Sequence, residues 1–154
     1  MGTPPRYTMT TNTSENPDLV RRYLKAFNDR DRETLADLLA EDVVEHGIDE
    51  ELHGAGAIVD FLDGHFEAFP DYTGTTDAVV AEDDLVTVRY TAEGTHTGEY
   101  RGVEPTGHAA EWTGIAMYRI EDDEIAEVWL EEDRLGLLEQ LQLVTPPPQA
   151  HLRL

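Results

Sequence analysis

The stretch TGTTDAVVAEDDLVTVRYTAEGTH, residues 73–96, decides the fold class of this chain. Apolar residues occupy every second position in its latter half: Val86, Val88, Tyr90 and Ala92. This period of two is typical of a strand that buries one face. The acidic run at 82–84 has the length of a tight turn, so residues 73–81 and 85–96 are predicted to form two paired strands.

The same pattern continues toward the C-terminus. Residues 109–120 and 125–133 are predicted to form two further strands, joined by an acidic turn at 121–124. A longer connection, residues 98–108, separates them from the first pair. The sequence therefore predicts four long antiparallel strands.

Helical spacing dominates the residues before this sheet. An apolar stripe of period 3.6 follows Asn16-Pro17, and a shorter helix follows Asp31. A third helix begins after Gly54 and ends at Pro70. Helices followed by strands indicate an α+β domain. We expect a cone-shaped, curved antiparallel sheet packed against three N-terminal helices, with an apolar pocket between them.

The 154 residues fit one domain. Residues 1–15 are polar and aperiodic and are predicted to be a flexible tail, and residues 145–154 are predicted to be a proline-rich tail. The domain is expected to span residues 16–144, including a last helix over residues 135–143.

Composition argues against several classes of partner. The chain has 33 acidic and 11 basic residues, with a net charge of -22. It would repel both a phosphate backbone and an anionic membrane surface, so neither nucleic acid nor membrane is an expected partner. No segment resembles a signal peptide or a membrane span, and we expect a cytoplasmic location.

The acidic residues are spread along the whole chain, and Lys25 is the single lysine. This composition resembles that of proteins from halophiles that accumulate salt, where multimolar salt screens self-repulsion. We therefore expect an acidic, halophilic protein. The alternative is an ordinary acidic protein.

Nothing in the sequence indicates a cofactor. The chain has no cysteine, which removes thiolate metal sites and cysteine nucleophiles. Its histidines lack metal-binding spacing, and its glycines do not form a phosphate-binding loop. We expect neither metal nor cofactor.

Three stretches together resemble the SnoaL-like polyketide cyclase or ester cyclase family, whose superfamily shares the cone-shaped fold of ketosteroid isomerase and scytalone dehydratase. They are VRRYLKAFNDRDRETLADLLAEDVVEHG (20–47), GTHTGEYRGVEPTGH (94–108) and EWTGIAMYRIEDDEIAEVWLEEDRLGLLEQL (111–141). The resemblance implies an intramolecular aldol ring closure on a small hydrophobic carbonyl substrate, without metal or cofactor. It also implies a homodimer or larger homo-oligomer that pairs through the open face of the sheet.

Asp133 matches the position of the acid/base aspartate in that family. Asp133 also shares strand parity with Trp129, whose ring would form an apolar wall and raise the pKa of the carboxyl. The alternative is that Asp133 caps the last helix. Glu131 stands where the family's cyclases often have histidine, and it is either a pocket neighbour of Asp133 or a solvated surface residue.

Two histidines are candidates to assist catalysis. His46 follows two valines near the expected mouth of the pocket, and His96 continues the face of Val86 and Val88. Either could donate a hydrogen bond to a substrate carbonyl and stabilise an enolate, or be a structural histidine. His65 lies on the apolar stripe of the third helix and is expected to line the pocket or the core.

Four aromatic residues are candidates to line a substrate pocket, although a role in the core is the commoner one. They are Trp112, Tyr118, Tyr23 and Phe27. Two other functions stay open. One is an isomerase, dehydratase or epoxide hydrolase on the same fold, and the other is a non-catalytic module that binds a small molecule or dimerises.

Overall fold

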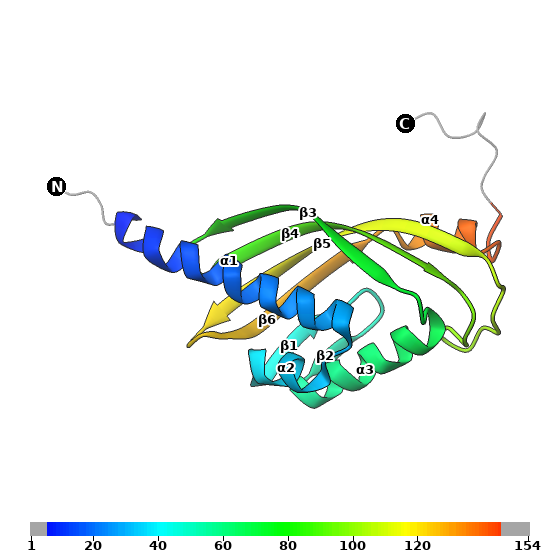
Figure 1. Cartoon of the computed structure of the whole chain (residues 1–154), viewed down its shortest axis with the longest axis horizontal. Coiled ribbons are helices and arrows are strands. Elements are labelled where there is room, and N and C mark those ends of the chain that lie inside the picture. Colours follow the sequence, from blue (N-terminus) through cyan, green and yellow to red (C-terminus); the bar gives the residue numbers. More distant parts are fainter. Residues whose placement is uncertain (1–5, 146–154) are drawn as a thin grey trace.

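The computed structural model describes residues 6–145, which form one α+β unit (Figure 1). In chain order the elements are α1 (Arg6–Asp29), α2 (Arg32–Leu38), β1 (Leu39–His46), β2 (Glu51–His53), α3 (Ala55–Ala68), β3 (Thr73–Glu82), β4 (Leu85–Thr95), β5 (Ala109–Glu121), β6 (Glu124–Glu132) and α4 (Arg134–Gln140). None of these helices is long and apolar enough to cross a membrane.

The strands form one open six-stranded sheet in the order β2-β1-β6-β5-β4-β3. The predicted strands correspond to β3–β6, which pair antiparallel as expected. The sheet as a whole is mixed, because β1 runs parallel to β6 and β2 pairs with β1. The sequence analysis missed β1 and β2. A register shift between Leu39 and Val44 breaks the alternation of β1, and β2 has only 3 residues.

The two predicted acidic turns are confirmed. Asp122 and Asp123 both have positive φ angles, of 54° and 62°, and connect β5 to β6. Asp83 has a φ of 55° between β3 and β4. Aspartate tolerates this left-handed region better than most residues, which suits it to a two-residue hairpin.

Helix α1 begins at Arg6 rather than at Asn16, so residues 6–15 continue the helix. Pro17 lies inside the helix, and the Asn16 side chain donates to the carbonyl of Asp83 at 3.2 Å instead of capping. The polar residues before Asn16 carry no apolar stripe, so periodicity could not reveal this extension. Residues 1–5 and 146–154 of the predicted tails lie outside the described part of the chain.

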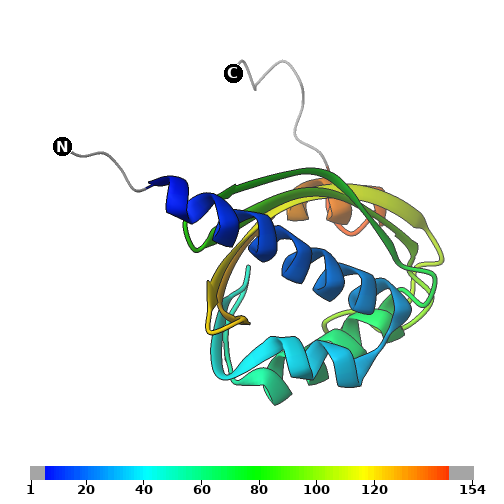
Figure 2. The same cartoon turned by 60° about the vertical axis from the view of Figure 1, so that its left-hand side comes forward.

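Helices α1, α2 and α3 lie along the inner side of the curved sheet, as Figure 2 shows. The main core fills the space between them and includes Val20, Leu35, Ile58, Val88 and Ile125. A second apolar cluster lies where α4 packs, and it includes Phe69, Trp112, Leu137 and Leu141. Burial of each such side chain contributes about 1.5–3 kcal/mol, so the two clusters hold the helices against the sheet.

Candidate active site

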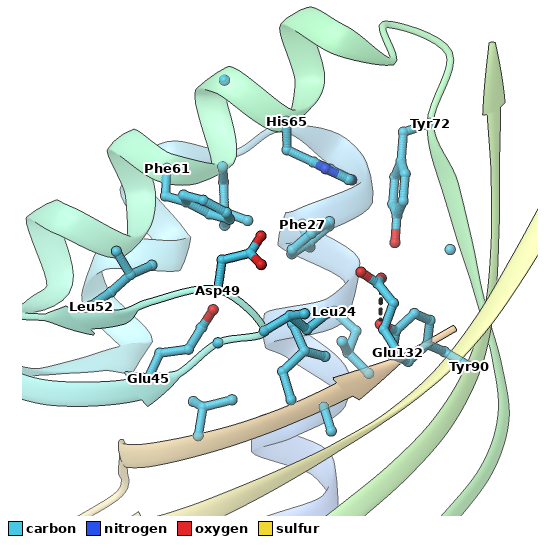
Figure 3. Close-up of a pocket in the computed structure, with 18 of the residues that line it drawn as sticks. Leu24, Phe27, Glu45, Asp49, Leu52, Phe61, His65, Tyr72, Tyr90 and Glu132 are labelled. Atoms are coloured by element: carbon cyan, nitrogen blue, oxygen red, sulfur yellow. Dashed lines mark hydrogen bonds between the residues drawn. The ribbon is translucent and has the colours of Figure 1, made fainter. Parts of the chain in front are cut away.

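A cavity of about 670 Å³ lies between the inner face of the sheet and helices α1 and α3 (Figure 3). Its apolar walls come from distant parts of the chain and include Leu24, Phe27, Leu52, Phe61 and Leu130. Polar and charged side chains also line it, among them Glu45, Asp49 and Glu132. A cavity of this size that combines apolar walls with polar groups is typical of a small-molecule site.

Glu45 is the most deeply buried carboxylate on this cavity. It shares the inner face of β1 with Val43, two positions earlier, and its residue surface is 8% exposed. No described residue forms a hydrogen bond or an ion pair with its carboxylate. Burial therefore raises the pKa of the Glu45 carboxyl from about 4.5 to about 7. A carboxyl with this pKa can both accept and donate a proton at neutral pH.

Glu132 supplies a second carboxylate, at the end of β6. Its Oε2 accepts hydrogen bonds from the Tyr90 hydroxyl at 3.0 Å and from Trp112 Nε1 at 2.9 Å. Tyr90, Gly114 and Glu132 face one another across β4, β5 and β6. A Cβ on Gly114 would collide with the Tyr90 hydroxyl, so glycine leaves the space through which Tyr90 reaches Glu132.

Burial and the Glu132 charge raise the pKa of the Tyr72 hydroxyl and the pKa of the Tyr90 hydroxyl well above the usual range for tyrosine. Both hydroxyls therefore stay protonated and can donate hydrogen bonds at any physiological pH. In Figure 3 Glu45 and Glu132 lie on different walls of the cavity, with Tyr72 near Glu132. Among the described residues, Glu45 thus has no hydrogen-bond or ion-pair partner, whereas Glu132 is anchored by two hydrogen bonds.

Asp49 joins three segments at one side of the cavity. Its Oδ2 pairs with the guanidinium groups of Arg101 at 2.6 Å and Arg134 at 2.8 Å. All three residues line the cavity. These ion pairs connect the β1–β2 loop to the loop before β5 and to α4. They also neutralise much of the positive charge that the two arginines bring to this site.

The structure places Asp133 at the start of α4, where its Oδ1 accepts a hydrogen bond from the Gly136 N–H at 2.8 Å. The residue is exposed and does not line the cavity. This is the helix cap that the sequence left as the alternative to catalysis. Glu131 is also exposed and outside the cavity.

His46 and His96, the two other catalytic candidates, do not line the cavity either. His46 bonds to Glu51 at 2.9 Å and to Glu127 at 2.7 Å, and its ring stacks on Trp129. Trp129 is therefore a neighbour of His46 and not a cavity wall. His96 is fully buried, and its Nδ1 accepts from the Thr106 N–H at 3.1 Å. The structure does not bring Asp133, His46 and His96 together.

The other predicted binding residues lie closer to the cavity. Tyr23, Phe27, His65 and Tyr118 line it. Trp112 stands behind the wall, where its Nε1 holds Glu132. Among the described residues there is no cluster of three or more side chains that could hold a metal ion.

Sequence reasoning missed Glu132 and Glu45 for two different reasons. The strand parity of β6 was counted from Trp129, which placed odd-numbered residues inward. Trp129 instead stacks on His46 outside the cavity, so the even-numbered residues Val128, Leu130 and Glu132 face the cavity. Glu45 could have been found from its spacing to Val43, had residues 39–46 been recognised as a strand.

The fold and the cavity define the class: an α+β cone with an interior cavity between its sheet and its helices. Comparison with known families then identifies the chain as a member of the SnoaL-like polyketide cyclase family, whose model matches residues 17–141. No curated protein matches the chain.

Solved structures agree with this membership. AclR from Streptomyces galilaeus, provisionally assigned as a hydroxylase, is 28% identical with a TM-score of 0.80, and the match covers 90% of this chain and 92% of AclR. IdmH from Streptomyces antibioticus, provisionally assigned as a polyketide cyclase, is 35% identical with a TM-score of 0.71, covering 82% of this chain and 98% of IdmH. A SnoaL-like protein from Jannaschia is 18% identical with a TM-score of 0.80, which supports the fold alone.

Proposed function

We propose that this protein is a cofactor-independent enzyme of the polyketide or ester cyclase type that closes a ring in a small hydrophobic carbonyl substrate. The observation that carries the proposal is the Glu45 carboxyl, which is buried on an apolar cavity with a pKa of about 7. Family membership supports the same class of chemistry. We assign the acid/base role to Glu45 and not to Asp133, because Asp133 is an exposed helix cap.

The reaction is an intramolecular aldol addition. The ionised Glu45 carboxylate removes a proton from the carbon between two carbonyl groups, which leaves an enolate. The enolate carbon forms a bond to another carbonyl carbon of the same molecule, and the oxygen of that carbonyl becomes an alkoxide. Protonated Glu45 then returns the proton to the alkoxide, which restores the carboxylate. One residue serves both steps because its pKa lies near neutral pH.

The first step can be measured without knowing the natural substrate. Ethyl benzoylacetate carries an acidic carbon between two carbonyls, and its exchange of hydrogen for deuterium in D₂O is followed by proton NMR. We expect the wild-type protein to accelerate this exchange at neutral pH. Glu45→Gln should lose about 10²- to 10⁴-fold of the acceleration, which is the usual contribution of a positioned base.

Asp133→Asn is the matched comparison, since asparagine keeps the ability to cap a helix. We expect Asp133→Asn to retain the wild-type exchange rate. The opposite pattern, with Glu45→Gln active and Asp133→Asn inactive, would return the acid/base role to Asp133. No acceleration by the wild-type protein would favour a non-catalytic binding module.

An epoxide hydrolase on the same fold has less support. That reaction needs two aspartates around one arginine to hold a water molecule. Here the charges are reversed, because Arg101 and Arg134 share Asp49. Arg89 pairs with Asp77 and is not a cavity residue. An isomerase would use Glu45 in the same first step and differ only in the carbon that receives the proton.

A further inference from the structure

His65 is a cavity residue that the proton-transfer steps above do not use. Helix α3 carries its ring into the cavity, where Figure 3 shows it above Phe27 and beside Tyr72. Aromatic rings surround it, with Tyr72 at 4.8 Å, Phe69 at 5.6 Å and Phe66 at 5.9 Å between ring centroids. No described residue forms a hydrogen bond with its imidazole nitrogens, so its N–H is free to bind a ligand.

The imidazole is neutral under physiological conditions. Burial and the nearby Arg30 guanidinium lower the pKa of His65 to about 4. Arg30 is held in place by hydrogen bonds to the carbonyls of Asn28 at 2.8 Å and Pro70 at 2.9 Å, and it lies 4.3 Å from the centre of the Phe66 ring. A neutral imidazole offers one N–H donor and one acceptor, and it does not attract an anion.

The cavity also disfavours anionic ligands. Glu45 and Glu132 place carboxylates on its walls, and its two arginines, Arg101 and Arg134, are already paired with Asp49. A ligand carboxylate would meet repulsion from these carboxylates, and both arginines that line the cavity already share Asp49. A ketone or ester carbonyl brings an acceptor oxygen without charge and meets no such penalty.

We propose that His65 is the hydrogen-bond donor for an uncharged carbonyl oxygen of the ligand, so that the site selects ketones or esters over the corresponding free acids. This inference deepens the proposed function, on which it rests for the presence of a carbonyl in the substrate. A donor at the carbonyl oxygen would also stabilise the enolate as charge develops there. Ligand binding is measured separately from proton transfer. The binding experiment can therefore fail while the deuterium-exchange assay succeeds, and the exchange assay can fail while the binding experiment succeeds.

The experiment compares the affinities of 1-tetralone and tetralin, which have the same two-ring skeleton and differ in the carbonyl. Kd values are measured by calorimetry for the wild type and for His65→Leu. We expect the preference for the ketone to fall about 2- to 10-fold in His65→Leu, the usual worth of one hydrogen bond. His65→Gln, which keeps a neutral donor, should retain most of the preference.

His53→Leu is the control, because His53 is an exposed histidine outside the cavity and its loss should leave the preference for the ketone unchanged.

If His65→Leu does not fold, nitrogen NMR of the histidine rings in the wild-type protein provides a second test. Saturating 1-tetralone should shift the His65 ring signals more than tetralin does. An unchanged preference in folded His65→Leu, an absence of ketone binding, or His65 signals that ignore 1-tetralone would overturn the inference. Equal or tighter binding of 1-naphthoate than of 1-tetralone would overturn the selection against acids.

Discussion

Glu45 loses the solvent around its carboxylate when the chain folds, and no described cation replaces that solvent. The folded protein therefore binds a proton at Glu45 more tightly than the unfolded chain does, with a pKa of about 7 against 4.5. The resulting contribution to stability is fully present below pH 4.5 and is lost as the pH rises through 7. At alkaline pH the fold therefore carries a buried carboxylate.

The stability lost when the buried Glu45 carboxyl ionises predicts a pH-dependent effect of Glu45→Gln on stability. Above pH 8 the neutral variant should be more stable than the wild type by roughly 3 kcal/mol, since each pKa unit is worth about 1.4 kcal/mol. Near pH 4 the two proteins should be almost equally stable. Urea unfolding across this pH range measures the difference. A constant difference at all pH values would show that Glu45 titrates normally in the folded protein.

At the residue scale, the sequence indicated the aromatic side chains of the cavity better than its carboxylates. Periodicity indicated that Tyr23, Phe27, His65 and Tyr118 lie on inward faces but could not separate a cavity wall from the core, and the structure places all four along the cavity. Glu132 was missed because Trp129 was expected to face the cavity, whereas its ring stacks on His46 outside it. A period of two separates the two faces of a strand but does not say which face is the inner one.

At the scale of elements, α4 depends on Asp133 for its first turn. The helix has 7 residues and buries Leu137, and Leu141 packs directly after it. So short a helix has little stability of its own and relies on its cap and on packing. Asp133 thus has a structural role in which its carboxylate is already occupied.

This role predicts that Asp133→Ala destabilises the fold by about 0.5–2 kcal/mol, the usual cost of removing a capping side chain. Asp133→Asn should cost much less, because asparagine also accepts from the backbone. Chemical unfolding of the three proteins at neutral pH measures both values. Equal losses in the alanine and asparagine variants would argue that Asp133 acts through its charge and not as a cap.

Helices and hairpin strands with a local period were predicted from the sequence, whereas β1 and β2 were not. Strands β3–β6 agree with the expected ranges within a few residues because their hairpins are tight and acidic. Strand β1 was not predicted, since its partner β6 lies about 80 residues away and its alternation is interrupted. Pairing over that distance is set by the tertiary fold.

At the scale of the whole molecule, charge is the dominant feature. The net charge of -22 makes self-repulsion a large term at low ionic strength. Several arginines are already paired with carboxylates, among them Arg89 with Asp77 and Arg119 with Glu127. Most of the remaining acidic side chains have only solvent and ions to screen them.

We therefore expect the melting temperature to rise steeply as KCl increases from dilute buffer to about 2 M, because screening shortens to a few ångströms at such ionic strength. Sucrose at matched osmolality serves as the control, since it stabilises proteins without screening charge. A melting temperature that does not respond to KCl, or that responds equally to sucrose, would contradict the halophilic interpretation.

The central claim is that Glu45 transfers the proton, and the pH dependence of deuterium exchange tests it most directly. The rate that the wild-type protein adds to the exchange of ethyl benzoylacetate should rise with pH and reach half of its maximum near pH 7, where the Glu45 carboxyl ionises. Glu45→Gln should abolish this component. A midpoint near pH 4.5, or a profile that survives in Glu45→Gln, would assign the proton transfer to another group.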